Sequence, residues 1–104
     1  MQHNTYIMVI TYYGHEYARL QFGDAVIAVN PVSKEASSAT ARFGADIALV
    51  SANDSFHNGT EQVVGGGRET FVIRGPGEYE VKEVVIKGFA VPPKEDGVQR
   101  TVYF

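Results

Sequence analysis

The chain has 104 residues, of which 44% are hydrophobic and 20% are charged, with no cysteine and a formal net charge of −3. This length fits one domain, and the lack of cysteine excludes disulfides and thiolate metal sites. The acidic balance disfavours nucleic-acid binding, and no apolar run approaches the ~20 residues of a membrane span. Without a signal peptide either, the expected location is cytoplasmic, with no membrane partner.

Strand signals separated by turns fill the first part of the chain. Residues 1–6 are expected to form a flexible leader, and residues 7–104 a single domain. Ile7–Tyr13 is rich in β-branched and aromatic residues, which favours a strand. Glu16–Phe22 alternates in polarity and is joined to Ala25–Val29 by Gly-Asp, which predicts a tight hairpin.

Two segments are apolar on both faces, which is typical of strands covered on both sides. They are Ala25–Val29 and Ala45–Ser51, and the small polar residues between them predict a loop. Thr60 is expected to cap a short helix. The triple glycine at 65–67 lacks the Lys and Ser/Thr of a phosphate loop and is interpreted as an ordinary loop.

The last third continues the pattern of strands and turns. Strands are expected at Glu69–Ile73, at Tyr79–Val91 as either one long strand or two strands that bend near Lys82, and at Val98–Phe104, with turns at Gly75–Tyr79 and Pro92–Gly97. No segment shows a strong apolar period of 3.6 residues. The fold class is therefore mainly β, with one or two short helices.

Candidate functional side chains gather in the stretch LVSANDSFHNG, which follows a buried strand. Asp54 and His57 are three residues apart and suit either a metal or acid–base pair, or a polar loop whose side chains bond their own backbone. His15 either faces a site or lies exposed at a hairpin end. Glu78 and Glu80 share one face of a strand, so they suit either acid–base chemistry or a simple turn.

Landmarks in order along the chain resemble the N-terminal half of a metallo-β-lactamase-fold hydrolase. They are ITYYGHEYARLQFGDAVIAVNP, ADIALVS, RETFVIRGPGEYEVKEVVIKGF and RTVYF, and GPGEYEV is the most specific of them. The resemblance implies half of an αββα sandwich. It also implies a His-x-His-x-Asp-His loop of metal ligands after the second buried strand, a spacing that aims several donors at one zinc ion.

The sequence departs from that ligand pattern at most positions. Ala52 and Asp54 stand where the two histidines are expected, and Phe56 stands where the aspartate is expected, so that only His57 fits. Asn30 replaces the aspartate of an Asp-Pro pair at the end of a strand. The candidate metal ligands are Asp54, His57 and His15, the catalytic candidates are Asp54 and His57, and the candidate binding residues are Asn30, Asn53 and Glu78.

The expected function follows from this partial match. A half-fold leaves an apolar sheet face bare, so we expect a homodimer in which a second copy covers it. The first hypothesis is a scaffold or binding module with a degenerate metal motif and no cofactor. The alternative is a weak metal-dependent hydrolase of an ester, lactam or phosphodiester, with zinc or another divalent metal at low occupancy in a site assembled across the dimer. A nucleic-acid-binding remnant is a third hypothesis, which the acidic balance disfavours.

Overall fold

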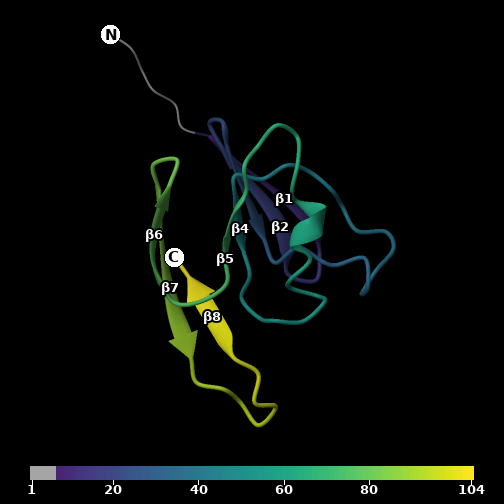
Figure 1. Cartoon of the computed structure of the whole chain (residues 1–104), viewed down its shortest axis with the longest axis vertical. Coiled ribbons are helices and arrows are strands. Elements are labelled where there is room, and N and C mark those ends of the chain that lie inside the picture. The colour runs from purple at the N-terminus through teal and green to yellow at the C-terminus, as the bar shows by residue number, and fades with distance from the viewer. Residues whose placement is uncertain (1–6) are drawn as a thin grey trace.

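The computed structural model describes residues 7–104, and the predicted leader at 1–6 lies outside the described residues. The described chain forms two β-sheets and one short 3-10 helix (Figure 1). The mainly-β class predicted from the sequence is confirmed. No helix in this part of the chain is long and apolar enough to cross a membrane.

The larger sheet has five strands in the order β1-β2-β3-β4-β5. Its first three strands are antiparallel, and β4 and β5 are parallel to β3. The predicted hairpin is present with the Gly23–Asp24 turn, but the second buried strand is shorter than predicted. The strands are β1 (Met8–Gly14), β2 (Tyr17–Phe22), β3 (Ala25–Val29), β4 (Ile47–Leu49) and β5 (Phe71–Ile73).

The smaller sheet is an antiparallel meander of β6 (Gly77–Val81), β7 (Val84–Val91) and β8 (Arg100–Tyr103). The prediction of a turn over Gly75–Tyr79 was wrong, because β6 already begins at Gly77. The predicted bend near Lys82 is a full chain reversal. Lys82 and Glu83 have φ of 50° and 65°, as a two-residue type I′ turn requires.

Apolar side chains pack on both faces of the five-stranded sheet. On the inner face, Ile27, Ile47, Leu49 and Ile73 pack against Ile86 of the three-stranded sheet. The outer face is covered by the long β3–β4 loop and by the 3-10 helix. The expectation that the doubly apolar strands leave a bare face was wrong, because this chain covers both of their faces.

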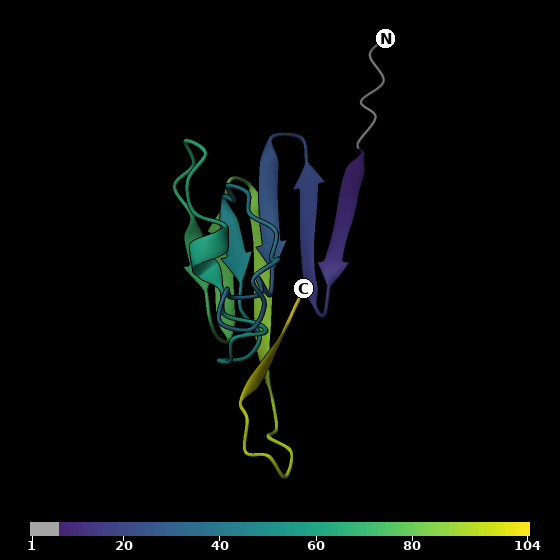
Figure 2. The ribbon, with the colours of Figure 1, turned by 90° about the vertical axis from the view of Figure 1, so that its right-hand side faces the viewer.

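The bare apolar surface lies elsewhere, on two neighbouring regions. Face on, the three-stranded sheet lies behind the middle of the five-stranded sheet, and no strand of residues 7–104 lies behind β1 (Figure 2). We call the solvent-exposed inner-face residues of the first two strands the β1–β2 shelf: Met8, Ile10, Tyr12 and Phe22, which are 39–68% exposed. We call the apolar residues on the far side of the small sheet the β7–β8 face: Val85, Phe89, Val102 and Phe104, which are 45–75% exposed.

The short helix predicted near Thr60 is the 3-10 helix η1 (Thr60–Gln62). Gly59, not Thr60, occupies the N-cap position, and no side chain caps the helix. The Gly59 backbone lies so close to Ser33 that a Cβ there would be 2.4 Å from the Ser33 nitrogen. A glycine is needed at this position because the helix packs directly against the start of the β3–β4 loop.

A buried carboxylate ties the two sheets together at the end where the β2–β3 and β6–β7 turns lie. Asp46 Oδ2 accepts from the Val26 N–H at 2.8 Å and from Arg68 Nη1 at 2.5 Å, and Oδ1 lies 3.2 Å from Lys82 Nζ. Burial alone would raise the pKa of Asp46. The hydrogen bonds from Val26 and Lys82 and the charges of Arg68 and Lys82 outweigh it and hold this pKa below its usual range.

Asp46→Asn is expected to lower the free energy of unfolding by about 3 kcal/mol at neutral pH, because it leaves two cations beside an uncharged buried group. The pKa of Asp46 is lower in the folded protein than in the unfolded chain, where it is about 4. The stability that the Asp46 carboxylate contributes is therefore present above the unfolded-state pKa, and it is lost as the pH falls through the folded-state pKa. Urea unfolding should therefore show that the difference in free energy of unfolding between wild type and Asp46→Asn becomes smaller from pH 7 to pH 3.

Asp96→Asn is the matched control. Asp96 also has a lowered pKa, of about 2, caused first by its hydrogen bond from Arg100, but the two side chains are 46% and 39% exposed. Its loss should leave the urea midpoint at pH 7 unchanged. An effect of Asp96→Asn as large as that of Asp46→Asn would contradict the role assigned to the buried carboxylate.

Candidate functional site

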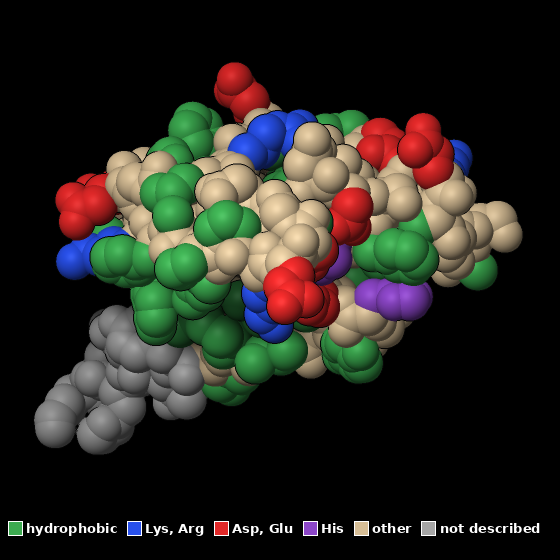
Figure 3. Space-filling model, turned by 90° about the horizontal axis from the view of Figure 1, so that it is seen from below, with side chains coloured by type: hydrophobic (Ala, Val, Ile, Leu, Met, Phe, Trp, Pro, Cys, Tyr) green, Lys and Arg blue, Asp and Glu red, His purple; other side chains and the backbone are tan. Residues whose placement is uncertain are grey.

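The candidate residues meet where β3 and β4 end and where β1 turns into β2. The parallel pairing of β3 and β4 brings their carboxyl ends to one edge of the sheet. The loop at 51–59 crosses this edge and meets the β1–β2 turn. Seen from this side, histidine side chains lie beside acidic ones, with apolar side chains around them (Figure 3).

Asn30 organises the end of β3. It is buried and has a φ of 46°, a left-handed conformation that asparagine tolerates better than most residues. Its backbone N–H donates to Leu49 O at 2.8 Å. Its side-chain Oδ1 accepts from both the N–H and the hydroxyl of Ser51, at 2.8 and 3.0 Å. The amide therefore fixes the first residue of the loop at 51–59.

His57 lies between two carboxylates. Its Nδ1 is 2.6 Å from Asp54 Oδ1, and its Nε2 is 3.0 Å from Glu16 Oε2. A doubly protonated ring can donate to both oxygens, whereas a neutral ring can donate to only one of them. Asn30 Nδ2 also donates to Glu16 Oε2, at 3.4 Å. Ser51, Asn30, Glu16, His57 and Asp54 thus form one continuous chain of polar contacts, which we call the polar ladder.

Besides Ser51, the sequence prediction missed one ladder member, Glu16. This residue lies in the β1–β2 turn and is 41 residues away from His57 along the chain. The predicted hairpin of β2 and β3 offered one signal, because it places the start of β2 beside the end of β3. No local spacing indicates that the His57 ring reaches it.

Asp54 also holds the backbone of the loop. Its Oδ1 accepts from the Phe56 N–H at 2.9 Å, and its carbonyl accepts from the backbone of His57 and Asn58. This is the arrangement of a polar loop that bonds its own backbone. The acid–base alternative meets an obstacle as well, because neither nitrogen of His57 is free to face a substrate.

The residues at this edge do not fit a zinc ion. Ala52 is buried and has no donor atom, and Phe56 offers only a ring. The carboxylates of Asp54 and Glu16 lie at opposite nitrogens of His57, so the three groups do not converge on one point. Within residues 7–104, no group of three or more His, Asp or Glu side chains is placed to hold a metal ion.

The other candidate residues lie around the ladder or away from it. His15 has a φ of 53°, and its ring lies 4.7 Å from that of Phe56, centre to centre. Asn53 Oδ1 accepts from Asn58 Nδ2 at 2.9 Å within the loop. Glu78 lies apart, on the far side of the small sheet, where its carboxylate is 3.8 Å from Lys87 Nζ. The structure therefore brings Asp54, His57 and Asn30 together, but not Glu78.

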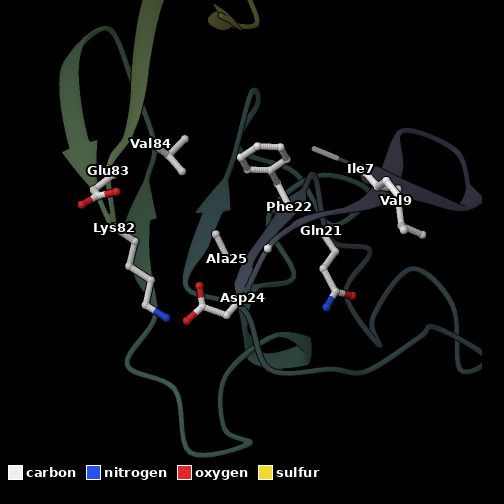
Figure 4. Close-up of a pocket in the computed structure, with 10 residues that line it drawn as sticks. Ile7, Val9, Gln21, Phe22, Asp24, Ala25, Lys82, Glu83 and Val84 are labelled. Carbon is white, nitrogen blue, oxygen red and sulfur yellow. The ribbon is translucent and has the colours of Figure 1, made fainter. Parts of the chain in front are cut away.

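A hollow of about 790 Å³ lies at the opposite end of the sandwich, between the β2–β3 and β6–β7 turns (Figure 4). Phe22, Val9 and Val84 line it, with Asp24 and Lys82 at its rim. Lys82 is already paired with Asp46. This hollow joins the β1–β2 shelf and shares no residue with the polar ladder.

The family of the chain follows from comparison with known proteins. Residues 9–103 match the family model described as a beta-lactamase superfamily domain. The match spans nearly the whole chain, so this chain belongs to that family. A search of curated protein sequences found no match.

Two solved structures share the fold. One, from Thermotoga maritima, is of a protein proposed to be a Zn-dependent hydrolase of the metallo-β-lactamase superfamily. It is 29% identical with a TM-score of 0.71, over 93% of this chain and 43% of that one. The other, from Parabacteroides distasonis, is of a proposed metal-dependent hydrolase. It is 20% identical with a TM-score of 0.66, over 94% of this chain and 55% of that one. This chain therefore spans about half the length of each.

Asn30→Ala is expected to lower the free energy of unfolding by about 3 kcal/mol, because it removes the acceptor for Ser51 and puts alanine in a left-handed conformation. Asn30→Gly removes the same acceptor but tolerates that backbone, so it should cost about 1 kcal/mol less. Urea unfolding measures both variants. Equal losses would show that the left-handed backbone contributes nothing, and no loss in either would contradict the role of the amide.

Proposed function

We propose that this chain is a metallo-β-lactamase-fold half-domain with a degenerate metal motif, acting as a dimerising scaffold or binding module. The observation that supports the degenerate metal motif is that both ring nitrogens of His57 contact carboxylates. The one histidine that fits the family pattern is held by Asp54 on one nitrogen and by Glu16 on the other. The neighbouring ligand positions hold Ala52 and Phe56, which cannot replace it.

The bare apolar surface supports the dimer. The β1–β2 shelf and the β7–β8 face together offer eight large apolar side chains that are at least 39% exposed. At roughly 100 Å² each, they supply the ~800 Å² per partner that a stable interface needs. A protein of this size seldom leaves this many large apolar side chains exposed to water.

A second copy is the occupant that fits this surface best. The solved relatives have chains about twice as long, so a second body of comparable size exists in them. Two copies of this chain restore that size. A twofold axis that sets the shelf of one copy against the β7–β8 face of the other buries both regions in both copies. With a net charge of −3 per copy, mutual repulsion is weak.

Sedimentation of the purified chain at tens of micromolar should give a dimer. Ile10→Glu on the shelf and Phe89→Glu on the β7–β8 face should each give a monomer, because each places a charge in the same apolar interface. Val64→Glu is the matched control, since Val64 is 52% exposed but lies on neither region.

Far-UV circular dichroism of each variant separates dissociation from unfolding. A wild-type monomer would contradict the dimer, and so would equal dissociation by Val64→Glu. Dissociation by only one of the two charged variants, with both folded, would contradict the paired use of shelf and face.

Metal analysis tests the degenerate motif. After dialysis against ten micromolar zinc, the protein should hold far less than one zinc per chain, because the ladder groups do not converge on one point. His57→Ala should leave that content unchanged. Stoichiometric zinc that is lost together with ester, lactam or phosphodiester hydrolysis in His57→Ala would instead support the alternative, a weak hydrolase assembled across the dimer.

A further inference from the structure

A second hollow, of about 520 Å³, lies beside the polar ladder at the carboxyl ends of β4 and β5. Its walls come from three parts of the chain: the segment Val50–Asn53 after β4, the segment with Arg74 and Pro76 after β5, and Gln99 with Thr101 at the start of β8. The volume lies in the range of small-molecule sites. Ligands commonly bind where neighbouring parallel strands end, as β4 and β5 do here.

The lining of this hollow has one positive charge and no carboxylate. Arg74 supplies the charge, and the other polar side chains are two amides and two hydroxyls, from Asn53, Gln99, Ser51 and Thr101. Asn53 Oδ1 already accepts from Asn58, which leaves the Nδ2 hydrogens of Asn53 for a ligand. Ser51 already donates its hydroxyl hydrogen to Asn30, so the neutral donors beside the guanidinium group are the side-chain amides of Asn53 and Gln99.

The Arg74 side chain has no partner within the described residues, in contrast to three less exposed arginines elsewhere. Arg19 donates to Gln21 at 2.9 Å, Arg68 donates to Asp46, and Arg100 donates to Asp96 at 2.8 Å. Arg74 is exposed and makes no hydrogen bond or ion pair within residues 7–104. Its planar donor fork is free to bind an oxyanion on two oxygens at once.

The walls of the hollow are held in place before any ligand arrives. Ser51 is fixed by the two hydrogen bonds to Asn30, and the Thr101 N–H donates to Ser51 O at 3.0 Å. Thr101 is only 8% exposed. This link joins the edge of the small sheet to the loop at 51–59, so the donors keep their positions and binding costs little ordering.

The local charge selects the kind of anion. A single guanidinium balances one negative charge, and the carboxylates of Asp54 and Glu16 add a negative field in this region. A dianion such as phosphate is disfavoured in that field. Val50, Ala52 and Pro76 supply apolar wall, which suits an uncharged apolar body attached to the anionic group.

We propose that this hollow binds a small organic monocarboxylate, with its carboxylate on Arg74 and its apolar body against Val50, Ala52 and Pro76. The site uses neither the β1–β2 shelf nor the β7–β8 face, and it needs no metal. It is therefore independent of the dimer proposed above.

Titration of the ¹⁵N-labelled chain with sodium benzoate tests the site. Benzoate should shift the backbone amides of Ser51, Asn53 and Thr101 and the Nε–H of Arg74, saturating with a millimolar dissociation constant. Benzamide has the same shape without the charge and should bind at least tenfold more weakly. Inorganic phosphate should also bind at least tenfold more weakly than benzoate.

Two arginine variants decide the outcome. Arg74→Gln should weaken benzoate binding at least tenfold and leave the sedimentation behaviour unchanged. Arg42→Gln is the matched control, because Arg42 is also exposed and unpaired among the described residues but lines none of these hollows; it should bind benzoate like wild type. Equal binding of benzoate and benzamide, phosphate binding as tight as benzoate, or unchanged benzoate binding in Arg74→Gln would overturn the proposal.

Discussion

Five strands present an apolar inner face, and a sheet of only three strands covers it. This mismatch governs most of what the molecule can do. Over β3, β4 and β5 the two sheets share a closed core around Ile47 and Ile73, which are at most 1% exposed. Over β1 and β2 the same face remains open, although its residues continue the same apolar pattern. The uncovered part is thus a continuation of the core, and this is why a protein partner suits it better than water does.

The sequence predicted most of this fold because the signals were local. Alternation and the Gly23–Asp24 pair located the first hairpin, and the doubly apolar runs identified the two central strands. At Lys82 and Glu83 the sequence left open one long strand or two strands, for a physical reason. Type I′ turns favour Asn and Gly, since both central residues need positive φ, and Lys-Glu carries no such preference. The location of the bare face also could not be predicted, because it depends on how far one sheet extends past the other.

In the candidate site, too, the residues with local signals were predicted and those that depend on the tertiary fold were not. Asp54 and His57 were identified from their spacing, and their contact follows from a single turn of backbone. The order of the strands in the sheet places Glu16 and Ser51 beside Asn30 and His57. A prediction from residue spacing could therefore not include them as partners. Arg74 was not recognised either, because an arginine after a short strand is ordinary in sequence. Its significance depends on what surrounds it: amide donors line the same hollow, and no acid among residues 7–104 lies within hydrogen-bonding distance.

The two ends of the sandwich are stabilised in different ways, and the difference bears on function. At one end, the buried Asp46 pairs with two cations, and these three charged groups hold the sheets together. At the other end, the carboxylates of Asp54 and Glu16 are 45% and 64% exposed and hold the loop through His57. That loop is fixed by side chains of the chain itself, so its order does not depend on a bound ion. An edge that stays ordered in this way can support a binding role without a bound metal ion.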